Sequence, residues 1–390
     1  MSPSDLEARI DNAFSKGNNQ TGLQLLRELA NTGPVVAAVF HRLAVVEEQI
    51  GDRAAATQAH LKCLKHDSWN PLAYLYAAYW LEQTGQLEHA LAIYSLGLDL
   101  IESAAEPEAL AQQSGETQKR YRAAQQALRV HFSSLHQRSV GSSAECRRIK
   151  NAIWVRTHLH AFEFQNDRQR PHLFYIPNLA NSFEASAHVW LTELEQRSNE
   201  IADEFNKALP TIIDGGRPYL AAETSDNAGF GSLPGSLNWT ALDLFKNGKE
   251  HKAISCFFPK TLSMLESVPL YGLYEQPFEV FFSLLKAGQR INPHYGLSNH
   301  SLTVHLPIEV PENCHLTVDG NQLRWQQGKA LIFDDTLLHA AENNSDKQRI
   351  VLIFSIWNPQ LSEEERSAIQ RTFQARSEWL DKRTIVEPLP

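Results

Sequence analysis

The chain has few cysteines, and none of them are clustered. Only four occur among 390 residues: Cys63, Cys146, Cys256 and Cys314. No two of them form a Cys-x-x-Cys pair, so a disulfide framework or a structural zinc site built on closely spaced cysteines is not expected. This cysteine usage fits a reducing compartment, and we expect the protein to be cytoplasmic.

Long hydrophobic runs and an excess of basic residues are also absent. No run approaches the roughly 18 apolar residues of a membrane-spanning helix. The opening residues, MSPSDLEARIDNAF, lack the positively charged and apolar regions of a signal peptide. The formal net charge of -9 argues against a nucleic-acid binder. The length of 390 residues and the ordinary 43% hydrophobic content indicate a globular protein with more than one domain.

Three glycines recur at an interval of 34 residues near the N-terminus: Gly17, Gly51 and Gly85. A small residue follows each of them five positions later: Gly22, Ala56 and Ala90. Amphipathic segments such as AVFHRLAVVEEQ and ATQAHLKCL flank the glycines at helical spacing. A helix, a glycine turn and a second helix with this period resemble the tetratricopeptide repeat.

The resemblance implies an α-helical solenoid in residues 1–105, followed by a helical connector in residues 106–164. We count two and a half repeats between residues 5 and 103, because the first unit lacks most of its leading helix. A solenoid of this kind offers a concave surface for a peptide or a partner protein. The alternative is a capping and dimerisation module that binds nothing, so a homodimer is one of the expected states. The sequence leaves both interpretations open.

The C-terminal half changes to short apolar runs separated by Pro, Gly, Asn and Asp. Examples are LTVHLPIEV (302–310), HLTVDG (315–320), ALIFDD (330–335) and IVLIFSIW (350–357). These runs predict antiparallel strands of a compact barrel or jelly roll, with one helix near residues 182–208. Ser362 and Glu365 form a capping box, so the chain is expected to end in a helix. The fold class is therefore α+β multidomain, a helical solenoid followed by a jelly roll.

Two histidines and an arginine carry the candidate chemistry. His294 lies in a Pro-His-x-Gly turn just before a predicted strand, and His339 follows another strand 45 residues later. A barrel mouth would bring such strand ends together. Non-haem Fe(II) sites use two histidines and usually one carboxylate, and they leave positions open for 2-oxoglutarate and O2. Arg349, which opens the last strand, suits the far carboxylate of 2-oxoglutarate better than a lysine would.

The expected carboxylate is missing, because the residue two positions after His294 is Gly296. By spacing alone this argues against an ordinary iron dioxygenase. A zinc hydrolase is the less favoured alternative, since it needs a third protein ligand and a general base beside the metal. Neither is visible in the sequence.

The segments PHYGLSNHSLTVHLPIEVPENCHLTV and GKALIFDDTLLHAAENNSDKQRIVLIFSIWNPQLSEEER resemble the aspartyl/asparaginyl β-hydroxylases. That family has Gly at this position and holds iron with two histidines. The resemblance therefore implies that His294 and His339 are the metal ligands at the catalytic centre. It covers residues 165–366 and implies a double-stranded β-helix of the cupin type there, leaving 367–390 as a C-terminal helix and tail.

The resemblance also implies the cosubstrate site. It assigns Arg349 to the C5 carboxylate of 2-oxoglutarate, Ser283 to the same carboxylate, and His305 to a place near the cosubstrate that does not bind iron. His300 has no counterpart and is expected to be a loop residue. The implied function is an Fe(II)- and 2-oxoglutarate-dependent dioxygenase that uses O2 to hydroxylate an amino-acid side chain, at the β-carbon, in a peptide or protein. The helical repeats would present that substrate.

Two departures from the family bear on the substrate. Ser301 and Thr303 stand where related enzymes carry arginines that hold an acidic side chain, and Ala340 replaces a Glu after the second histidine. A carrier-bound amino acid or a lipid acyl chain is the alternative substrate, and a non-catalytic repeat scaffold is the alternative function. Asp334 and Asp335 either orient His339 or simply turn the chain after a strand.

Overall fold

The chain divides into two compact units. The computed structural model describes residues 3–32, 36–103, 114–165, 167–180, 183, 188–222, 230–273 and 275–384. The first unit comprises Met1–Ser134 with Arg376–Pro390, and the second comprises Leu135–Ala375. The predicted segment bounds at 105, 164 and 366 divide the chain differently and remain predictions. The first of them lies outside the described residues.

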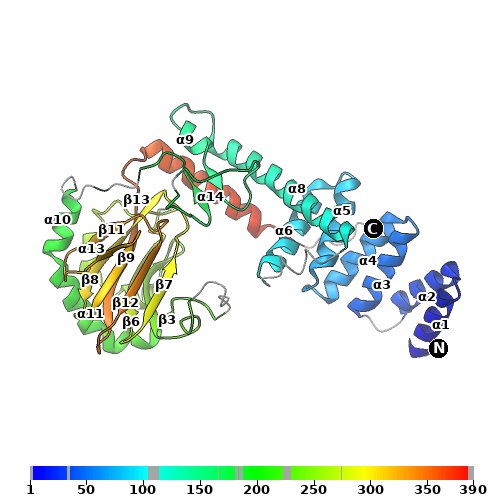
Figure 1. Ribbon diagram of the computed structural model, residues 1–390, viewed down its shortest axis with the longest axis horizontal. Coiled ribbons are helices and arrows are strands. Elements are labelled where there is room, and N and C mark those ends of the chain that lie inside the picture. The colour runs from blue at the N-terminus through cyan, green and yellow to red at the C-terminus, as the bar shows by residue number, and fades with distance from the viewer. Residues whose placement is uncertain are drawn as a thin grey trace. The chain divides into compact units, whose positions relative to one another are not determined.

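Six helices form three successive pairs in the described part of the first unit (Figure 1). They are α1 (Pro3–Ser15), α2 (Asn19–Thr32), α3 (Ala37–Gln49), α4 (Arg53–His66), α5 (Pro71–Gln83) and α6 (Leu87–Ser103). The prediction of an incomplete first repeat was wrong, because α1 has 13 residues, as many as α3. Its buried stripe is narrow and consists of Leu6, Ile10 and Ala13, which explains why the helical pattern is weak in the sequence.

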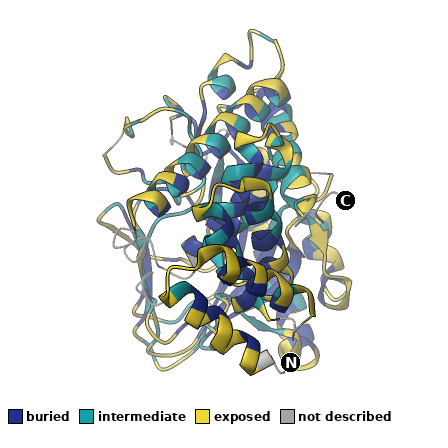
Figure 2. Cartoon of the chain, turned by 90° about the vertical axis from the view of Figure 1, so that its right-hand side faces the viewer, coloured by how far each residue is buried: buried dark blue, intermediate teal, exposed yellow. Residues whose placement is uncertain are grey.

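The three recurring glycines end the first helix of each pair in the left-handed region, as predicted. Gly17, Gly51 and Gly85 have φ values of 73°, 88° and 84°, which glycine adopts without steric cost. The small residues that follow lie between the paired helices: a Cβ added at Gly22 would lie 2.8 Å from the Phe14 ring. The helices consequently bury one side and expose the other (Figure 2).

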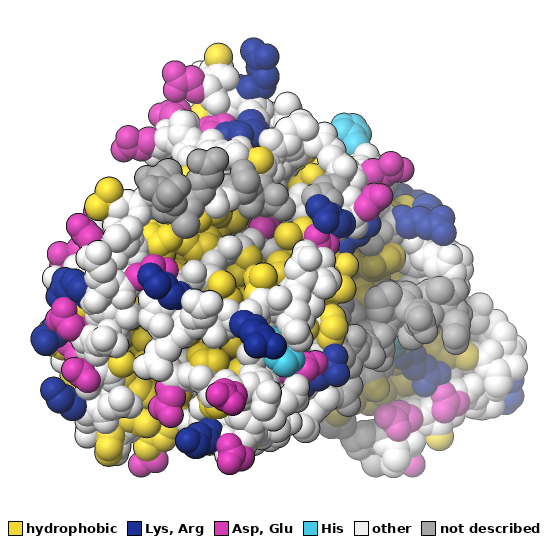
Figure 3. Space-filling model, turned by 60° about the vertical axis from the view of Figure 1, so that its left-hand side comes forward, with side chains coloured by type: hydrophobic (Ala, Val, Ile, Leu, Met, Phe, Trp, Pro, Cys, Tyr) yellow, Lys and Arg dark blue, Asp and Glu magenta, His cyan; other side chains and the backbone are white. Residues whose placement is uncertain are grey.

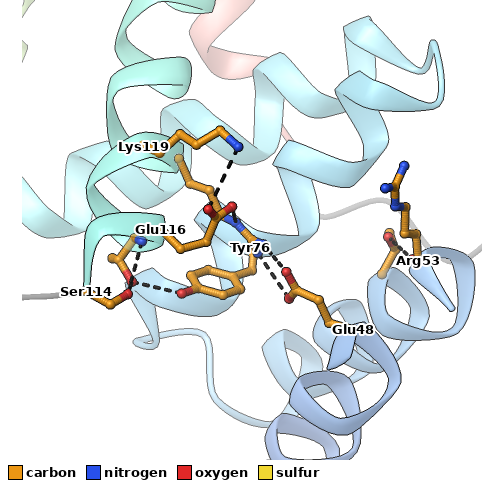
Figure 4. Close-up of polar contacts among 9 residues, drawn as sticks. Glu48, Arg53, Tyr76, Ser114, Glu116 and Lys119 are labelled. Atoms are coloured by element: carbon orange, nitrogen blue, oxygen red, sulfur yellow. Dashed lines mark hydrogen bonds and ion pairs between the residues drawn. The ribbon is translucent and has the colours of Figure 1, made fainter. Parts of the chain in front are cut away.

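Helix α8 (Gly115–Val140) begins in the first unit, where it packs on the first helices of two repeats. The Arg120 guanidinium is buried, forms an ion pair with Glu48 of α3, and lies 3.8 Å from the centroid of the Tyr76 ring of α5. The Tyr76 hydroxyl also hydrogen-bonds the Thr117 hydroxyl at 2.8 Å (Figure 4). The face of α5 that Tyr76 belongs to is therefore covered by α8.

The predicted helical connector, residues 106–164, contains only one turn of helix after the Ser- and Gly-containing stretch at 139–145. This turn is α9 (Arg147–Lys150), and the chain then enters the two-residue strand β1 (Ile153–Trp154). This strand pairs with β2 (Phe174–Tyr175), and the side chains of Trp154 and Phe174 are buried. The apolar pair at 153 and 154 therefore joins a hydrophobic core in an extended conformation instead of prolonging a helix.

Two antiparallel sheets form the second unit. The strands are β3 (Arg217–Pro218), β4 (Trp239–Lys246), β5 (Lys249–Glu250), β6 (Glu279–Leu285), β7 (Arg290–His294), β8 (Ser301–Glu309), β9 (Cys314–Val318), β10 (Asn321–Leu323), β11 (Leu331–Phe333), β12 (His339–Asn343) and β13 (Arg349–Trp357). The larger sheet has the order β11-β8-β13-β6-β4-β3, with β5 beside β4, and the smaller has the order β10-β9-β12-β7. Numbered from β6, the eight strands to β13 are ordered 6-3-8-1 and 5-4-7-2. This is the jelly-roll order, so the predicted fold class is confirmed.

Strict alternation along the strands separates two cores. On β8, Leu302, Val304 and Leu306 face an outer core shared with helices, whereas residues 301, 303 and 305 face the space between the sheets. The helices on the outer side of the larger sheet are α10 (Val189–Gln196), α11 (Ser198–Ile212) and α13 (Pro259–Leu265), with the single turn α12 (Lys252–Ser255) nearby (Figure 1). The single helix predicted near 182–208 is thus two helices, α10 and α11, which are separated at Arg197.

The C-terminal helix α14 (Glu363–Asp381) starts with the predicted capping box. The backbone N–H of Glu365 donates to the Ser362 Oγ at 3.2 Å, and the backbone N–H of Ser362 donates to the Glu365 carboxylate at 3.0 Å. Among the described residues, no helix combines the length and the apolar character needed to cross a membrane.

One face of the molecule is drawn in Figure 3. Hydrophobic side chains gather in its middle, and described Lys and Arg side chains are interspersed with Asp and Glu around them. On this face, neither sign of charge dominates among the described residues.

Candidate active site

A cavity of about 490 Å³ lies between the two sheets of the second unit. His294, His339, Arg349 and Ser283 all line it, so four residues that are far apart in the sequence meet in one place. His305 lines it as well. The jelly roll achieves this because each sheet combines strands from both ends of the domain.

His294 and His339 lie directly opposite each other on neighbouring strands. His294 is the last residue of β7, not a residue before a strand as predicted, and His339 is the first residue of β12. The two strands are antiparallel and pair these residues in register, with ring centroids 4.1 Å apart. The fold therefore fixes the separation of the two rings through the backbone ladder.

Backbone carbonyls hold both imidazole rings. The His294 Nδ1 lies 2.8 Å from the carbonyl oxygen of Asn292, and the His339 Nδ1 lies 3.0 Å from that of Leu337. A ring that donates from Nδ1 keeps its lone pair on Nε2, which is the arrangement of a metal-ligating histidine. Burial lowers the pKa of His294, and burial followed by the charge of His294 lowers that of His339 to about 4. Both rings are therefore neutral at pH 7 and able to bind a divalent metal.

The position expected to carry a third ligand is filled from elsewhere in the chain. A Cβ at Gly296 would lie 2.2 Å from the Cγ and Oδ1 atoms of Asp335. Asp335 lines the cavity, and its Oδ2 accepts a hydrogen bond from Thr303 at 3.3 Å. No group of three or more His, Cys, Asp or Glu side chains suited to hold a metal occurs in the described part of the chain. Two histidines are thus the ligands that these residues offer.

Arg349 is a buried cation without a carboxylate partner among the described residues. It is 1% exposed, its Nη2 donates to the Ser283 Oγ at 3.0 Å, and its Nε has no hydrogen-bond acceptor. The Trp239 Nε1 also donates to the Ser283 Oγ, at 3.1 Å. Because that oxygen accepts two hydrogen bonds, the Ser283 proton remains for a ligand. Burial lowers the pKa of Arg349 to about 10, so the group stays charged at neutral pH.

These residues lie in a region that a family comparison identifies. A model of the family described as aspartyl/asparaginyl beta-hydroxylase matches residues 195–359. This part of the chain is therefore similar to the aspartyl/asparaginyl β-hydroxylases. The match contains His294, Gly296, His339 and Arg349, so these cavity residues lie inside the matched region.

Named relatives match the same half of the chain. The human protein named aspartyl/asparaginyl beta-hydroxylase is 26% identical over 190 residues, which are 47% of this chain and 24% of that protein. Aspartate beta-hydroxylase domain-containing protein 2 of Xenopus tropicalis is 26% identical over 211 residues, 53% of this chain and 55% of that protein. The human protein of the latter name is 36% identical over 94 residues, 23% of this chain and 26% of that protein. The chain thus spans between about a quarter and about half of their lengths.

Solved structures are more distant. A cupin 2 conserved barrel domain protein from Salinispora arenicola shares 13% identity, with coverage of 35% of this chain and 87% of that one and a TM-score of 0.22. Such a score carries no argument about fold. The jelly roll of this β-hydroxylase-like domain rests on its own strand order.

Two of the remaining histidines differ in their surroundings. His305, inside β8 as predicted, stacks on Trp325 and is close to Phe333, and its Nδ1 has no partner. Burial, followed by the charges of Arg349 and His339, lowers its pKa well below the usual value. His300 does lie in the turn before β8, but it is 2% exposed and both its ring nitrogens are unpartnered. No pattern in the sequence indicated that His300 is buried.

The two consecutive aspartates have different places in the β-hydroxylase-like domain. Asp334 accepts hydrogen bonds from the backbone N–H and the hydroxyl of Thr336, at 2.9 and 2.5 Å, and from Gln169 at 2.6 Å. It therefore shapes the turn after β11, which is the plainer of the two interpretations. Asp335 faces the cavity, where burial, followed by the charge of Asp334, raises its pKa to about 7.

Trp239 and Glu279 were missed by the sequence reasoning. Both line the cavity, from β4 and β6 respectively. Trp239 opens a strand that the apolar pattern does not distinguish from a loop, because Gly, Ser and Pro precede it closely. Glu279 stands at the start of a strand whose next residues are apolar, and the alternation VFFSLL does not show which face it takes.

Proposed function

We propose that the second unit binds Fe(II) and 2-oxoglutarate and uses O2 to hydroxylate an amino-acid side chain, at its β-carbon, in a peptide or protein. The observation that carries this proposal is the pairing of two neutral histidines with an unpaired buried arginine in one cavity. The similarity of residues 195–359 to the β-hydroxylase family supports the same reaction type.

The residues present fit the metal. His294 and His339 would hold it through Nε2, since a backbone carbonyl engages Nδ1 of each ring. When bound, Fe(II) together with 2-oxoglutarate and O2 supplies the oxidising chemistry that places one oxygen atom in a C–H bond of the substrate. The chain's contribution is to position the reactants and to exclude water.

The residues also fit the cosubstrate. A planar guanidinium binds a carboxylate with two parallel hydrogen bonds, and Arg349 has an unpartnered Nε and no ion pair with a described carboxylate. Ser283 has a proton to donate to the same anion, because Trp239 and Arg349 occupy its oxygen as acceptor. A dicarboxylate would therefore be anchored at its far end in a dry part of the cavity.

The helical repeats are a candidate for presenting the substrate, and support for this is indirect. Three complete helix pairs precede the catalytic domain, but α8 already covers part of the face of α5. The same chemistry on a carrier-bound amino acid or a lipid acyl chain is the alternative, favoured by the apolar side chains of Leu173, Leu273 and Phe278 along the cavity. Cytoplasmic location and homodimerisation remain predictions.

Anaerobic titration tests the proposed function directly. The protein is loaded with Fe(II), 2-oxoglutarate is added, and the weak visible charge-transfer band of the chelate is followed. We expect the band in the wild type and its loss in His339→Ala, while His315→Ala, a histidine outside the cavity, keeps it. Absence of the band from a wild type that holds Fe(II) would contradict the proposal and favour the scaffold interpretation.

A further inference from the structure

A row of polar side chains crosses the larger sheet at the other end of the cavity from Arg349. Thr303 of β8 pairs with Ser355 of β13, and Glu279 of β6 directly precedes Val280, the partner of Phe354. All three side chains line the cavity. Ser355 lies six residues along β13 from Arg349, which corresponds to about 20 Å of extended strand. This row therefore belongs to the part of the cavity left for a substrate.

Two carboxyl groups in this region form no ion pair with a described Lys or Arg, although the charges of Arg217 and Lys246 act on Glu279. Glu279 forms no hydrogen bond or ion pair with another described residue, and Asp335 has only the Thr303 hydroxyl as a side-chain donor. Burial raises the pKa of each to about 7, with a further contribution from Asp243 at Glu279 and from Asp334 at Asp335. Both side chains are half-buried, and a carboxyl group partly removed from water without an ion pair holds its charge only at a cost.

The cations near this row are Arg217 and Lys246, and neither lines the cavity. Among the described residues that line the cavity, Arg349 is the only Lys or Arg. Arg217 donates to both carboxylate oxygens of Asp243, at 2.6 and 2.9 Å, and to the carbonyls of Pro218 and Tyr219. Lys246, opposite Glu279 in register, is exposed and makes no ion pair with a described carboxylate. Among the described residues, no Lys or Arg side chain therefore faces the interior of the cavity at this end.

A second hollow beside the cavity is also lined by acidic residues. It has a volume of about 550 Å³, and the glutamates Glu250, Glu266 and Glu275 line it, with no Lys or Arg among its described lining residues. Residues adjacent in the sequence line the two spaces: Tyr271 and Phe278 line the cavity, whereas Leu270 and Pro277 line the second hollow. A peptide that enters the cavity past these residues meets carboxylates on both sides of them.

We propose that the cavity takes the cationic side chain of a lysine or arginine residue in a peptide, with Glu279 as its main partner. That this peptide is a substrate rests on the proposed function. Binding of its cationic side chain in the cavity does not need turnover. A charge-assisted hydrogen bond would compensate the half-buried carboxylate, and the aromatic side chains of Tyr271 and Phe278 line the same cavity, where a ring can contact a cation. Ser301 and Thr303, in place of arginines, leave an acidic side chain without a counterion.

The test uses the full chain and three blocked synthetic peptides that differ only in the central residue, which is Lys, norleucine or Asp. Binding is measured calorimetrically without added metal, and again anaerobically with Fe(II) and 2-oxoglutarate. We expect the Lys peptide to bind about tenfold or more tightly than the other two. Glu279→Gln should remove this preference and leave the affinity for the norleucine peptide unchanged. Glu193→Gln, an exposed carboxylate on α10, is the matched control and should change nothing.

The outcomes are separable from those of the metal titration. Equal or tighter binding of the Asp peptide overturns the proposal, as does an unchanged Lys preference in Glu279→Gln or a lack of binding by all three peptides. A Lys preference that depends on Glu279 supports it even where the charge-transfer band is absent, in which case only the proposed hydroxylation fails. Succinate release that the Lys peptide stimulates and the Asp peptide does not would show that the cavity recognises the cationic side chain and also carries out the proposed reaction.

Discussion

The Asp335 carboxylate occupies the space into which any side chain at position 296 would project. A Cβ at Gly296 would approach the Asp335 Cγ to 2.2 Å. The backbone at 296 is fixed on both sides, because its N–H donates to the Asp335 carbonyl at 2.7 Å and its carbonyl accepts from the His172 N–H at 3.1 Å. A side chain at position 296 and the Asp335 carboxylate therefore cannot occupy this space together, so packing accounts for the glycine at this position of the proposed metal site.

Gly296→Ala should destabilise the protein by about 1–3 kcal/mol, because the new methyl group displaces Asp335 from its hydrogen bond with Thr303. In the Asp335→Ala background the same substitution should cost much less, since the space is then free. Chemical denaturation of the four proteins measures this coupling as a double-mutant cycle. Gly215→Ala is the control, because its Cβ would make only an ordinary contact of 3.4 Å with Ile254. Additive costs would show that the two positions do not compete.

The sequence predicted the strands well and placed His294 and His339 at strand ends, for a physical reason. Strand alternation and the turn residues between strands are local signals, and His294 and His339 lie at strand ends where these signals change. The partners of Arg349 were only partly accessible: Ser283 was found by resemblance, whereas Trp239 donates to it across 44 positions of sequence. No local pattern encodes that contact.

The features that could not be predicted depend on the register of the strands in the sheets and on packing between distant segments. Whether Glu279 faces the cavity depends on the register of β6 with β4, where Glu279 pairs with Lys246, and the apolar residues after it suit either face. The place of Asp335 against Gly296 depends on a loop packing on a strand end, which spacing does not show. In the first unit, α1 was underestimated because three buried residues are enough to dock a helix whose other residues are polar.

We expect Arg349 to be needed for 2-oxoglutarate binding and to lower the stability of the ligand-free protein. Arg349→Lys replaces a planar fork by a single ammonium, so the dissociation constant for 2-oxoglutarate in the presence of Mn(II) should rise about tenfold or more. Arg349→Met should abolish binding, yet raise the melting temperature of the ligand-free protein, because it removes a buried charge that has no ion pair.

Calorimetry and thermal unfolding check both Arg349 variants. Arg290→Met, at a side chain that is 59% exposed and paired with Glu342, is the control and should alter neither quantity. A 2-oxoglutarate affinity that survives in Arg349→Met would place the cosubstrate elsewhere.

Glu279 should make stability fall as the pH rises. Its pKa is raised from 4.5 to about 7 in the folded protein, mainly by burial, so between these values the unfolded chain releases a proton that the folded chain keeps. Stability is lost across that window. The charged groups that act on Glu279 are Asp243, Arg217, Lys246, Asp335 and Tyr219.

Near pH 4.5, Glu279→Gln should accordingly have the same melting temperature as the wild type. Above pH 7 its melting temperature should be higher, and its free energy of unfolding should exceed that of the wild type by about 1–3 kcal/mol. Melting curves between pH 4.5 and 8 measure the difference, with Glu193→Gln as the exposed control. A difference that is constant with pH would mean that Glu279 ionises normally in the folded state.

The Arg120 cluster should hold α8 on the repeats. Arg120 is 1% exposed, pairs with Glu48 and Glu116, and has its pKa lowered to about 10 by burial (Figure 4). Glu48→Ala leaves the guanidinium with the half-exposed Glu116 alone, so we expect a cost of about 3 kcal/mol. Arg120→Met should cost less, because it removes the charge and keeps an apolar chain over Tyr76. Hydrogen exchange of the full chain measures both effects locally: amides of α5 and of the first turns of α8 should exchange faster in Glu48→Ala than in Arg120→Met. The reverse order would show that stacking on Tyr76, and not the ion pair, determines the docking of α8.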